Sequence, residues 1–183
     1  MDELSLVAAS QAGNRVAFDS LINRYYKDIY RLAYQHTGSH HEADDLCQET
    51  FLRAFDAIRD LRDASCFRAW IFMIASNLLR KRMKEVKRRR KLALEASEST
   101  SVGLVENNNM EPLERLSAKE KAAIVHQRLQ EMPEDMRLAT ILVLMQGLTQ
   151  KEAAAALDCS EASVCRRLDM ARQWLKAKLR NLV

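Results

Sequence analysis

The hydrophobic residues in the first half of the chain recur at steps of three and four, the spacing that places them on one face of an α-helix. This recurrence predicts helices over residues 16–37 and 42–58, and a third from about 66 to 91. A short polar loop, residues 59–65, precedes the third. We therefore expect a first domain of three or four helices over residues 1–92.

Between residues 93 and 115 the helical spacing disappears, and serine, asparagine and acidic residues dominate. We interpret 93–115 as an acidic flexible linker. The spacing returns over residues 116–183, which predicts a second helical domain. With four glycines, two prolines and 6% aromatic residues among 183, the composition also favours helices over sheets. The expected fold class is all-α, with two small helical domains joined by the linker.

The second domain contains the pattern of two short helices joined by a tight turn. Thr149 and Glu152 form a capping box that starts a helix over residues 150–157. Ser160 is a suitable N-cap for the next helix, which has a polar outer face. Its inward face is apolar: Val164, Leu168, Ala171 and Leu175. We interpret the pair as a helix-turn-helix whose second helix enters the major groove of DNA. A plain helical hairpin with a solvated face is the alternative.

The outer face of that second helix carries side chains suited to DNA. Arg166 has the donor geometry for a bidentate contact with guanine, and Asp169 can accept from the amino group of cytosine. Arg167 and Arg172 suit phosphates. Among these, Arg166 is the strongest candidate for reading a base.

The predicted helix 42–58 has two contrasting faces. At 100° per residue one face is apolar and is expected in the core: Cys47, Phe51, Ala54, Phe55 and Ile58. The opposite face is acidic and amide-bearing, with one leucine: Asp45, Gln48, Glu49, Leu52 and Asp56. This stripe is suited to a basic helical surface of a partner protein. A solvated face without a partner is the simpler alternative.

The predicted helix 66–91 combines an aromatic residue, an amide and cations on one face. Trp70 can stack on a base, Asn77 can hydrogen-bond a base edge, and Arg80, Lys81 and Lys84 can follow phosphates. A buried tryptophan is the competing interpretation of Trp70. The net charge is only +4, so the uneven distribution of charge carries the argument for a nucleic-acid partner.

Neither a catalytic nor a metal site is expected. The four cysteines form no CxxC pair, and the four histidines have no spacing that assembles metal ligands. A phosphate-binding glycine loop and a nucleophile motif are also missing from the sequence. We therefore expect no enzyme, no cofactor and no metal. No apolar run approaches the ~20 residues that cross a bilayer, and the N-terminus does not resemble a signal peptide. The expected location is the cytoplasm.

Along nearly its whole length the chain resembles the extracytoplasmic-function sigma factors of bacterial RNA polymerase. ADDLCQETFLRAF (43–55) resembles the family's clamp-binding helix, and FRAWIFMIASNLLRKRMK (67–84) its helix for the −10 promoter element. Residues 129–179 resemble its −35-binding domain. The resemblance implies an alternative sigma factor that binds core polymerase, recognises both elements and promotes DNA melting. Implied partners are the clamp helices of the largest subunit, the flap, promoter DNA and an anti-sigma factor, without membrane insertion.

The resemblance also assigns residues to each contact. For the polymerase clamp they are Asp45, Gln48, Glu49 and Leu52. For the −10 element they are Arg62, Asp63, Ser65, Trp70, Asn77, Arg80, Lys81 and Lys84. The loop 61–67 corresponds to the segment that captures a flipped base of the non-template strand. For the −35 element they are Lys151, Ser163, Cys165, Arg166, Arg167, Asp169, Met170 and Arg172.

The second helix of the helix-turn-helix departs from the family pattern. Ala162 and Ser163 stand where the family commonly has Gly-Thr, and Cys165 and Met170 replace polar or basic residues. These changes remove hydrogen-bond donors, so the −35 sequence is expected to differ from the usual one. Two rival interpretations are a conventional helix-turn-helix regulator with an N-terminal partner-binding domain, and a scaffold that binds the clamp without directing initiation.

Overall fold

The computed structural model describes residues 2–96 and 117–179, which form helices without a β-strand. The N-terminal domain consists of α1 (Glu3–Gln11), α2 (Arg15–Thr37), α3 (His40–Ala57), the short 3-10 turns η1 (Ile58–Asp60) and η2 (Ala64–Cys66), and the long α4 (Phe67–Ala96). The C-terminal domain consists of α5 (Ala118–Glu131), α6 (Glu134–Thr140), the π-helical turn η4 (Ile141–Met145), α7 (Gln150–Leu157) and α8 (Glu161–Leu179). The all-α prediction is confirmed.

The helices begin and end where short polar residues and glycine allow it. Asn14 and Ser39 cap α2 and α3 by accepting from backbone N–H groups in the first turn. Gly38 ends α2 in the left-handed region, at φ 76°, which a side chain would strain. Thr149 and Glu152 form the predicted capping box at the start of α7. The turn after α7 passes through Asp158, also left-handed at φ 49°.

Helices α1 to α4 bury one apolar face each. The largest side chains of this core are Leu21, Ile29, Leu32, Leu46, Ile58, Phe67, Ile71, Phe72, Leu78 and Leu79. The predicted inner face of α3 is confirmed at Cys47, Phe51 and Ala54, but it is wrong at Phe55, which is 43% exposed. Phe55 lies at the edge of the core and meets the ring of Phe18 edge-on, 5.1 Å between centroids.

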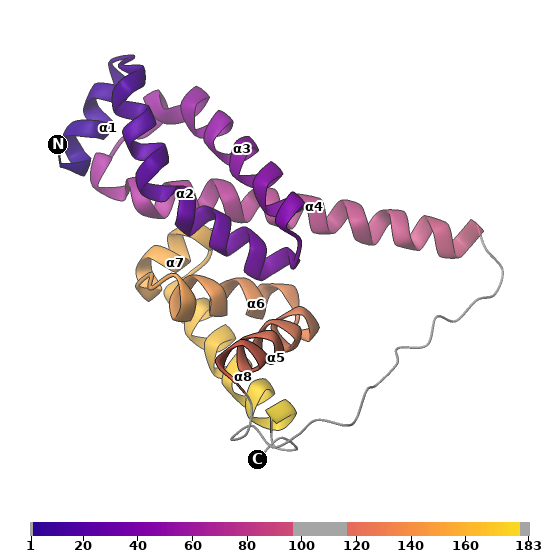
Figure 1. Ribbon diagram of the computed structural model, residues 1–183. Helices are drawn as coiled ribbons and strands as arrows, with labels where there is room; N and C mark the ends of the chain where they lie inside the picture. Colours follow the sequence, from indigo (N-terminus) through magenta and orange to yellow (C-terminus); the bar gives the residue numbers. More distant parts are fainter. Residues whose placement is uncertain (1, 97–116, 180–183) are drawn as a thin grey trace.

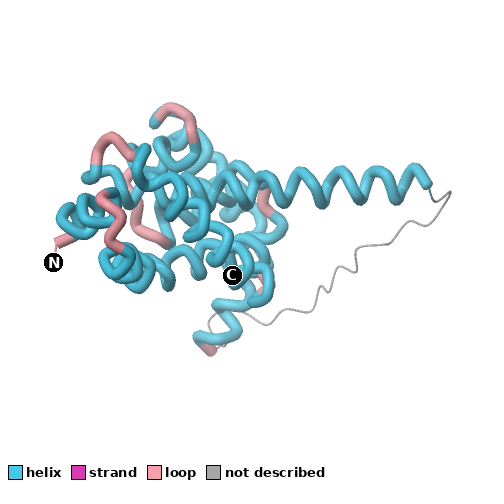
Figure 2. Tube along the Cα trace, turned by 90° about the horizontal axis from the view of Figure 1, so that it is seen from above, coloured by secondary structure: helices cyan, strands magenta, loops and turns pink. Residues whose placement is uncertain are grey.

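The two domains share their hydrophobic core. One continuous cluster of buried residues runs from α1 through α4 into η4, α7 and the first half of α8. Helix α7 lies along α4, and the C-terminal half of α2 lies against α5 and η4 (Figure 1). The buried alanines Ala153, Ala154 and Ala156 of α7 have small side chains that allow this close approach. The domains form one packed body, from which the C-terminal part of α4 projects (Figure 2).

Helix α4 continues past the expected domain boundary at residue 92, since its last helical residue is Ala96. The basic segment RKRMKEVKRRRK, residues 80–91, therefore runs out along the projecting part of this helix, where residues 86–93 are exposed. The part of the expected linker from 97 to 115 lies outside the described residues.

A buried histidine lies where the end of α2 meets α6. His36 is fully buried, and neither ring nitrogen has a hydrogen-bond partner among the described residues. Burial, followed by the neighbouring charge of Arg137, lowers the pKa of His36 to about 3. The guanidinium of Arg137 instead donates to the backbone carbonyl of His36 at 3.0 Å. His36 is therefore neutral in the folded protein at ordinary pH.

This neutral histidine predicts a loss of stability in mild acid. An unfolded histidine binds a proton below about pH 6.5, whereas folded His36 does not until about pH 3. Below pH 6 the free energy of unfolding should fall by about 1.4 kcal/mol per pH unit from this group. Urea denaturation at several pH values between 7.5 and 5 measures this change in the free energy of unfolding.

The variant His36→Leu should flatten this dependence, while Leu144→Ala, which replaces an exposed side chain that carries no titratable group, should leave it unchanged. A wild-type stability that is the same at pH 5 and pH 7.5 contradicts the prediction.

Candidate nucleic-acid interface

Helix α8 presents the predicted outer face to solvent. Its inward side chains Val164, Leu168 and Ala171 are buried, as predicted. Ser160 accepts from the backbone N–H of Ser163 at 3.2 Å and so caps the helix. The following predicted DNA-contacting residues are exposed: Lys151 on α7, and Cys165, Arg166, Asp169, Met170 and Arg172 on α8. Six of the eight predicted −35 side chains are therefore exposed, and the other two, Ser163 and Arg167, are partly buried.

The charged groups on this surface differ in how far they are already paired. Arg172 donates to Asp169 at 2.8 Å, and Arg167 donates to Cys159 Sγ at 3.5 Å and lies 3.9 Å from Asp135. Arg166 makes no hydrogen bond or ion pair with the residues that the structure describes. It can reach a base without first breaking a contact.

The predicted −10 face of α4 is only partly open. Asn77, Lys81 and Lys84 are exposed, whereas Trp70 is partly buried and its ring centroid lies 5.7 Å from that of Phe67. Arg80 donates to the carbonyl oxygen of Leu157 in α7 at 2.9 Å. A groove along α4 is lined by Asn77, Arg80, Lys81, Lys84, Glu85 and Arg88. Its cationic lining is compatible with a phosphate backbone.

The loop before α4 is an ordered turn. Asp63 accepts from the backbone N–H of Ser65 at 2.9 Å and from its hydroxyl at 2.7 Å, and these bonds hold the pKa of Asp63 below its usual value. Arg62, Asp63 and Ser65 are all exposed. The turn thus displays the three loop side chains among the eight residues that the resemblance assigned to the −10 element.

The predicted polymerase-contacting stripe of α3 is solvent-accessible, with one member already engaged. Asp45, Gln48 and Leu52 are exposed, and Leu52 is 67% exposed. Glu49 accepts from Arg53 at 2.7 Å and from Arg82 of α4 at 2.9 Å. Burial raises the pKa of Glu49, but these hydrogen bonds outweigh burial, so the net shift is downward. Glu49 therefore also ties α3 to α4.

An apolar groove adjoins this stripe, and sequence analysis missed it. Phe18, Ile22, Tyr26, Phe51, Leu52 and Phe55 line it, together with Arg15, Asp19 and Gln48. Leu52 and Gln48 thus belong to both features. In the sequence, only the expected exposure of Leu52 indicated the groove. The groove residues of α2 could not be foreseen, because their place beside Leu52 depends on how α2 and α3 pack.

Two negative findings apply to the described residues. Within 2–96 and 117–179, no three histidine, cysteine, aspartate or glutamate side chains gather as a metal site. In the same ranges no helix is long and apolar enough to cross a membrane.

Comparison with known proteins matches both domains. Residues 21–90 match the family model for sigma-70 region 2, and residues 122–175 match the model for sigma-70 region 4. The ECF RNA polymerase sigma-E factor of Escherichia coli strain K12 is 32% identical over 183 residues, covering 97% of this chain and 94% of that protein. The chain belongs to the ECF sigma factors. The ECF sigma-E factor of Haemophilus influenzae is 27% identical and covers 100% of the chain and 98% of its own length.

Two solved structures have folds similar to that of this chain. CnrH, solved in complex with the cytosolic domain of CnrY, has a TM-score of 0.72 and 27% identity, and covers 97% of both chains. The sigma factor RpoE of Bartonella quintana, solved with the anti-sigma factor NepR, has a TM-score of 0.68 at 23% identity and supports the fold. It covers 89% of this chain and 96% of its own.

The family confirms the function expected from the sequence, an alternative sigma factor for transcription initiation. The conventional regulator is not favoured. Sigma factors are not a family of catalytic enzymes. The individual polymerase-contacting and DNA-contacting residues remain predictions.

The unequal pairing of the cations of α8 predicts unequal mutational effects. Arg166→Ala should cost about 1–3 kcal/mol on the preferred −35 sequence and relax preference at one base pair, because a bidentate base contact is lost. Arg172→Ala is the matched control and should weaken binding to all sequences alike, with a smaller salt dependence. Affinity of the holoenzyme for a set of single-base −35 variants measures both. Equal loss on every sequence for Arg166→Ala contradicts base reading.

Proposed function

We propose that this ECF sigma factor binds core RNA polymerase through the exposed stripe of α3 and contacts promoter DNA with α4 and α8. The observation that carries the proposal is the separation of charge: acidic and amide side chains on α3, and cations on the outer faces of α4 and α8. DNA attracts the second kind of surface and repels the first. One chain thus offers one surface for a basic protein partner and two for DNA.

At the polymerase, we assign the contact to Asp45, Gln48, Glu49 and Leu52, facing the clamp helices of the largest subunit. Exposure of Leu52 beside the apolar groove supports this assignment, since a protein interface commonly has an apolar centre and a polar rim. Asp45 and Glu49 supply negative charge for basic residues of the partner. The C-terminal domain is assigned to the flap.

At the −10 element, the projecting basic part of α4 follows the phosphates, while Asn77 and Trp70 meet bases. The ordered turn that displays Arg62, Asp63 and Ser65 is assigned the capture of a flipped base. Extruding a base costs a few kcal/mol, which stacking and pocket contacts offset. At the −35 element Arg166 reads a base, and Lys151, Arg167 and Arg172 contact phosphates.

An anti-sigma factor is the proposed regulator. The Bartonella quintana RpoE was solved with the anti-sigma factor NepR, and CnrH was solved with the cytosolic domain of CnrY. The apolar groove of α2 and α3 offers a surface for such a protein. The site of action is the cytoplasm, where the polymerase works, and the polymerase supplies all chemistry.

Run-off transcription tests the polymerase contact. Gln48→Ala combined with Leu52→Ala should reduce promoter-specific transcript about tenfold or more at limiting sigma factor, because the centre of the interface is lost. Glu49 is left intact, since its removal would also detach α3 from Arg82. Leu144→Ala, another exposed leucine, is the matched control and should transcribe as the wild type.

A double variant that transcribes normally and binds core polymerase with unchanged affinity would refute the assignment of α3. Sequence-specific DNA binding by the wild type without any polymerase-dependent transcript would refute the wider proposal.

A further inference from the structure

The last residue of α1 reaches the loop before α4. Gln11 ends α1, and its side-chain amide nitrogen donates to the backbone carbonyl oxygens of Ile58 at 3.1 Å and Leu61 at 2.7 Å. Ile58 begins η1 and Leu61 directly follows it, so both lie where the chain leaves α3 for the loop 61–67. The second bond joins residues 50 positions apart in the sequence. Gln11 was not among the residues that the sequence singled out.

The amide of Gln11 matches this pair of acceptors. A side-chain amide nitrogen carries two hydrogens and can donate both. Here the two bonds go to the carbonyl oxygens at the two ends of η1, so one side chain holds the whole turn. Both bonds are partly buried, and a carbonyl oxygen that loses its donor in such a place is costly to the fold. The start of the loop is therefore held by α1.

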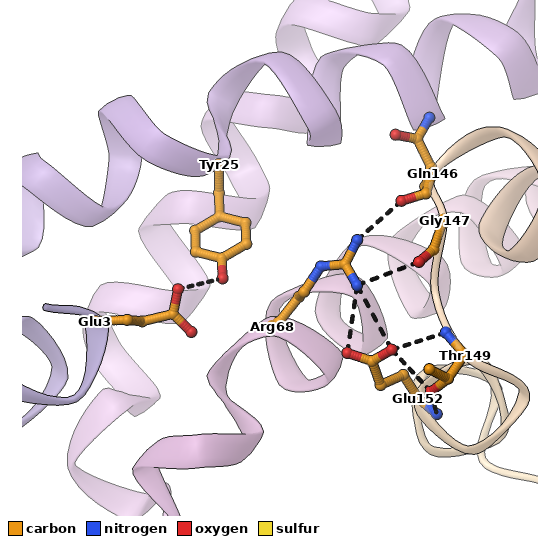
Figure 3. A network of polar contacts seen from close by, with 7 residues as sticks. All are labelled: Glu3, Tyr25, Arg68, Gln146, Gly147, Thr149 and Glu152. Carbon is orange, nitrogen blue, oxygen red and sulfur yellow. Dashed lines mark hydrogen bonds and ion pairs between the residues drawn. The ribbon is translucent and has the colours of Figure 1, made fainter.

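Helix α1 is itself firmly held. Val7 is fully buried and belongs to the shared core. Glu3, the first residue of α1, accepts from the hydroxyl of Tyr25 in α2 at 2.6 Å (Figure 3). The helix also lies against both η1 and η2, the turns on either side of the loop. Gln11 therefore reaches the loop from a fixed support.

The end of the loop next to α4 is shaped by local bonds. Besides the two bonds from Ser65, Asp63 accepts from Cys66 Sγ at 3.4 Å, and the carbonyl oxygen of Asp63 accepts from the backbone N–H of Cys66 at 3.0 Å. These bonds join residues only two or three positions apart, so they do not fix the turn against the rest of the domain. The side chains proposed to capture a base begin at Arg62, directly after the carbonyl that Gln11 holds.

We propose that Gln11 is a positioning residue for base capture at the −10 element. It holds the start of the loop in the arrangement that Arg62, Asp63 and Ser65 need to accept one base in preference to the others, and it acts through the loop rather than by contacting DNA. This role rests on the function proposed for the loop. A pocket that is ordered beforehand loses less conformational freedom when the base enters. Contacts in the pocket must offset the cost of extruding the base, so a loosened loop should discriminate less.

Hydrogen exchange of the free protein tests the anchor without a promoter. Gln11→Met keeps a long unbranched side chain but has no donor. The backbone amides of Leu61, Ser65 and Cys66 donate within the loop segment, and they should exchange about fivefold faster in the variant, the effect of roughly one net hydrogen bond. Gln11→Lys restores a donor and should recover part of the protection. Unchanged exchange in a folded Gln11→Met protein overturns the proposal.

Two further variants separate the anchor from folding. Gln130→Ala is the matched control, because its amide also donates to the backbone carbonyl oxygen of a distant helix, that of Gln35 at 3.0 Å. It should lower the free energy of unfolding and leave exchange in the loop as in the wild type. Equal acceleration in Gln130→Ala would mean a general loss of stability and would overturn the specific role. If Gln11→Met loses its helical circular dichroism, Gln11→Asn, one methylene shorter, takes its place.

The base preference of the holoenzyme tests the consequence. Run-off transcription from promoters with each of the four bases at each −10 position gives a ratio that does not depend on how much sigma factor is folded. Gln11→Met should reduce this ratio about fivefold at the captured position and leave the preference in the −35 element unchanged. Gln11→Lys should restore part of it, and Gln130→Ala should keep the wild-type ratio. Faster loop exchange with an unchanged ratio overturns the role in base capture.

Direct changes to the loop distinguish this proposal from the proposed function. Asp63→Ala and Ser65→Ala alter the pocket itself. If neither changes the −10 preference of the wild type, the assignment of the loop is refuted, and the role of Gln11 with it. If the preference depends on Asp63 or Ser65 but is the same in Gln11→Met, the positioning role alone is refuted.

Discussion

The burial of apolar surface between α4 and α7 is the interaction on which the arrangement of this protein depends. Each domain has fewer than 100 residues, and small domains bury a modest fraction of their surface. Here the core of the N-terminal domain continues through α4 into the alanine-rich α7 and on to Val164 and Leu168 of α8. The relative position of α4 and α8, the two helices proposed to contact DNA, follows from this shared core.

Arginine side chains at the same boundary between the domains donate to backbone carbonyl oxygens. Arg137 is buried and donates to carbonyl oxygens of His36, Gln130 and Met132, each at 3.0 Å. Burial lowers the pKa of Arg137, and this set of carbonyls compensates for the water that the guanidinium has lost. Arg68 of α4 likewise donates to the carbonyl oxygen of Gln146 at 2.8 Å, and Arg80 to that of Leu157 at 2.9 Å. These arginine-to-carbonyl bonds depend on the position of the backbone rather than on matching side chains.

Local pattern predicted much of the fold and of the site. The capping box of Thr149 and Glu152, the end of α2 before Gly38 and the buried face of α8 depend on neighbours within one or two helical turns, which the sequence displays directly. The exposed stripe of α3 and the open position of Arg166 followed from the same periodicity. Phe55 was misplaced because it lies at the margin of the apolar face, where packing against Phe18 decides how much of the ring is covered.

By itself, then, the sequence determined which residues form each helix, which face of it is apolar and which family it resembles, because these properties arise from local spacing and motif order. Only the tertiary structure decided that the His36 ring is buried with neither nitrogen bonded to any residue that the structure describes. It also decided that Glu49 binds Arg82 and that Arg68 pairs with Glu152 while Arg80 donates to Leu157. Those contacts join residues 33 to 84 positions apart, or a side chain to a distant carbonyl oxygen. No periodicity records such pairs, since they exist only once the helices have packed.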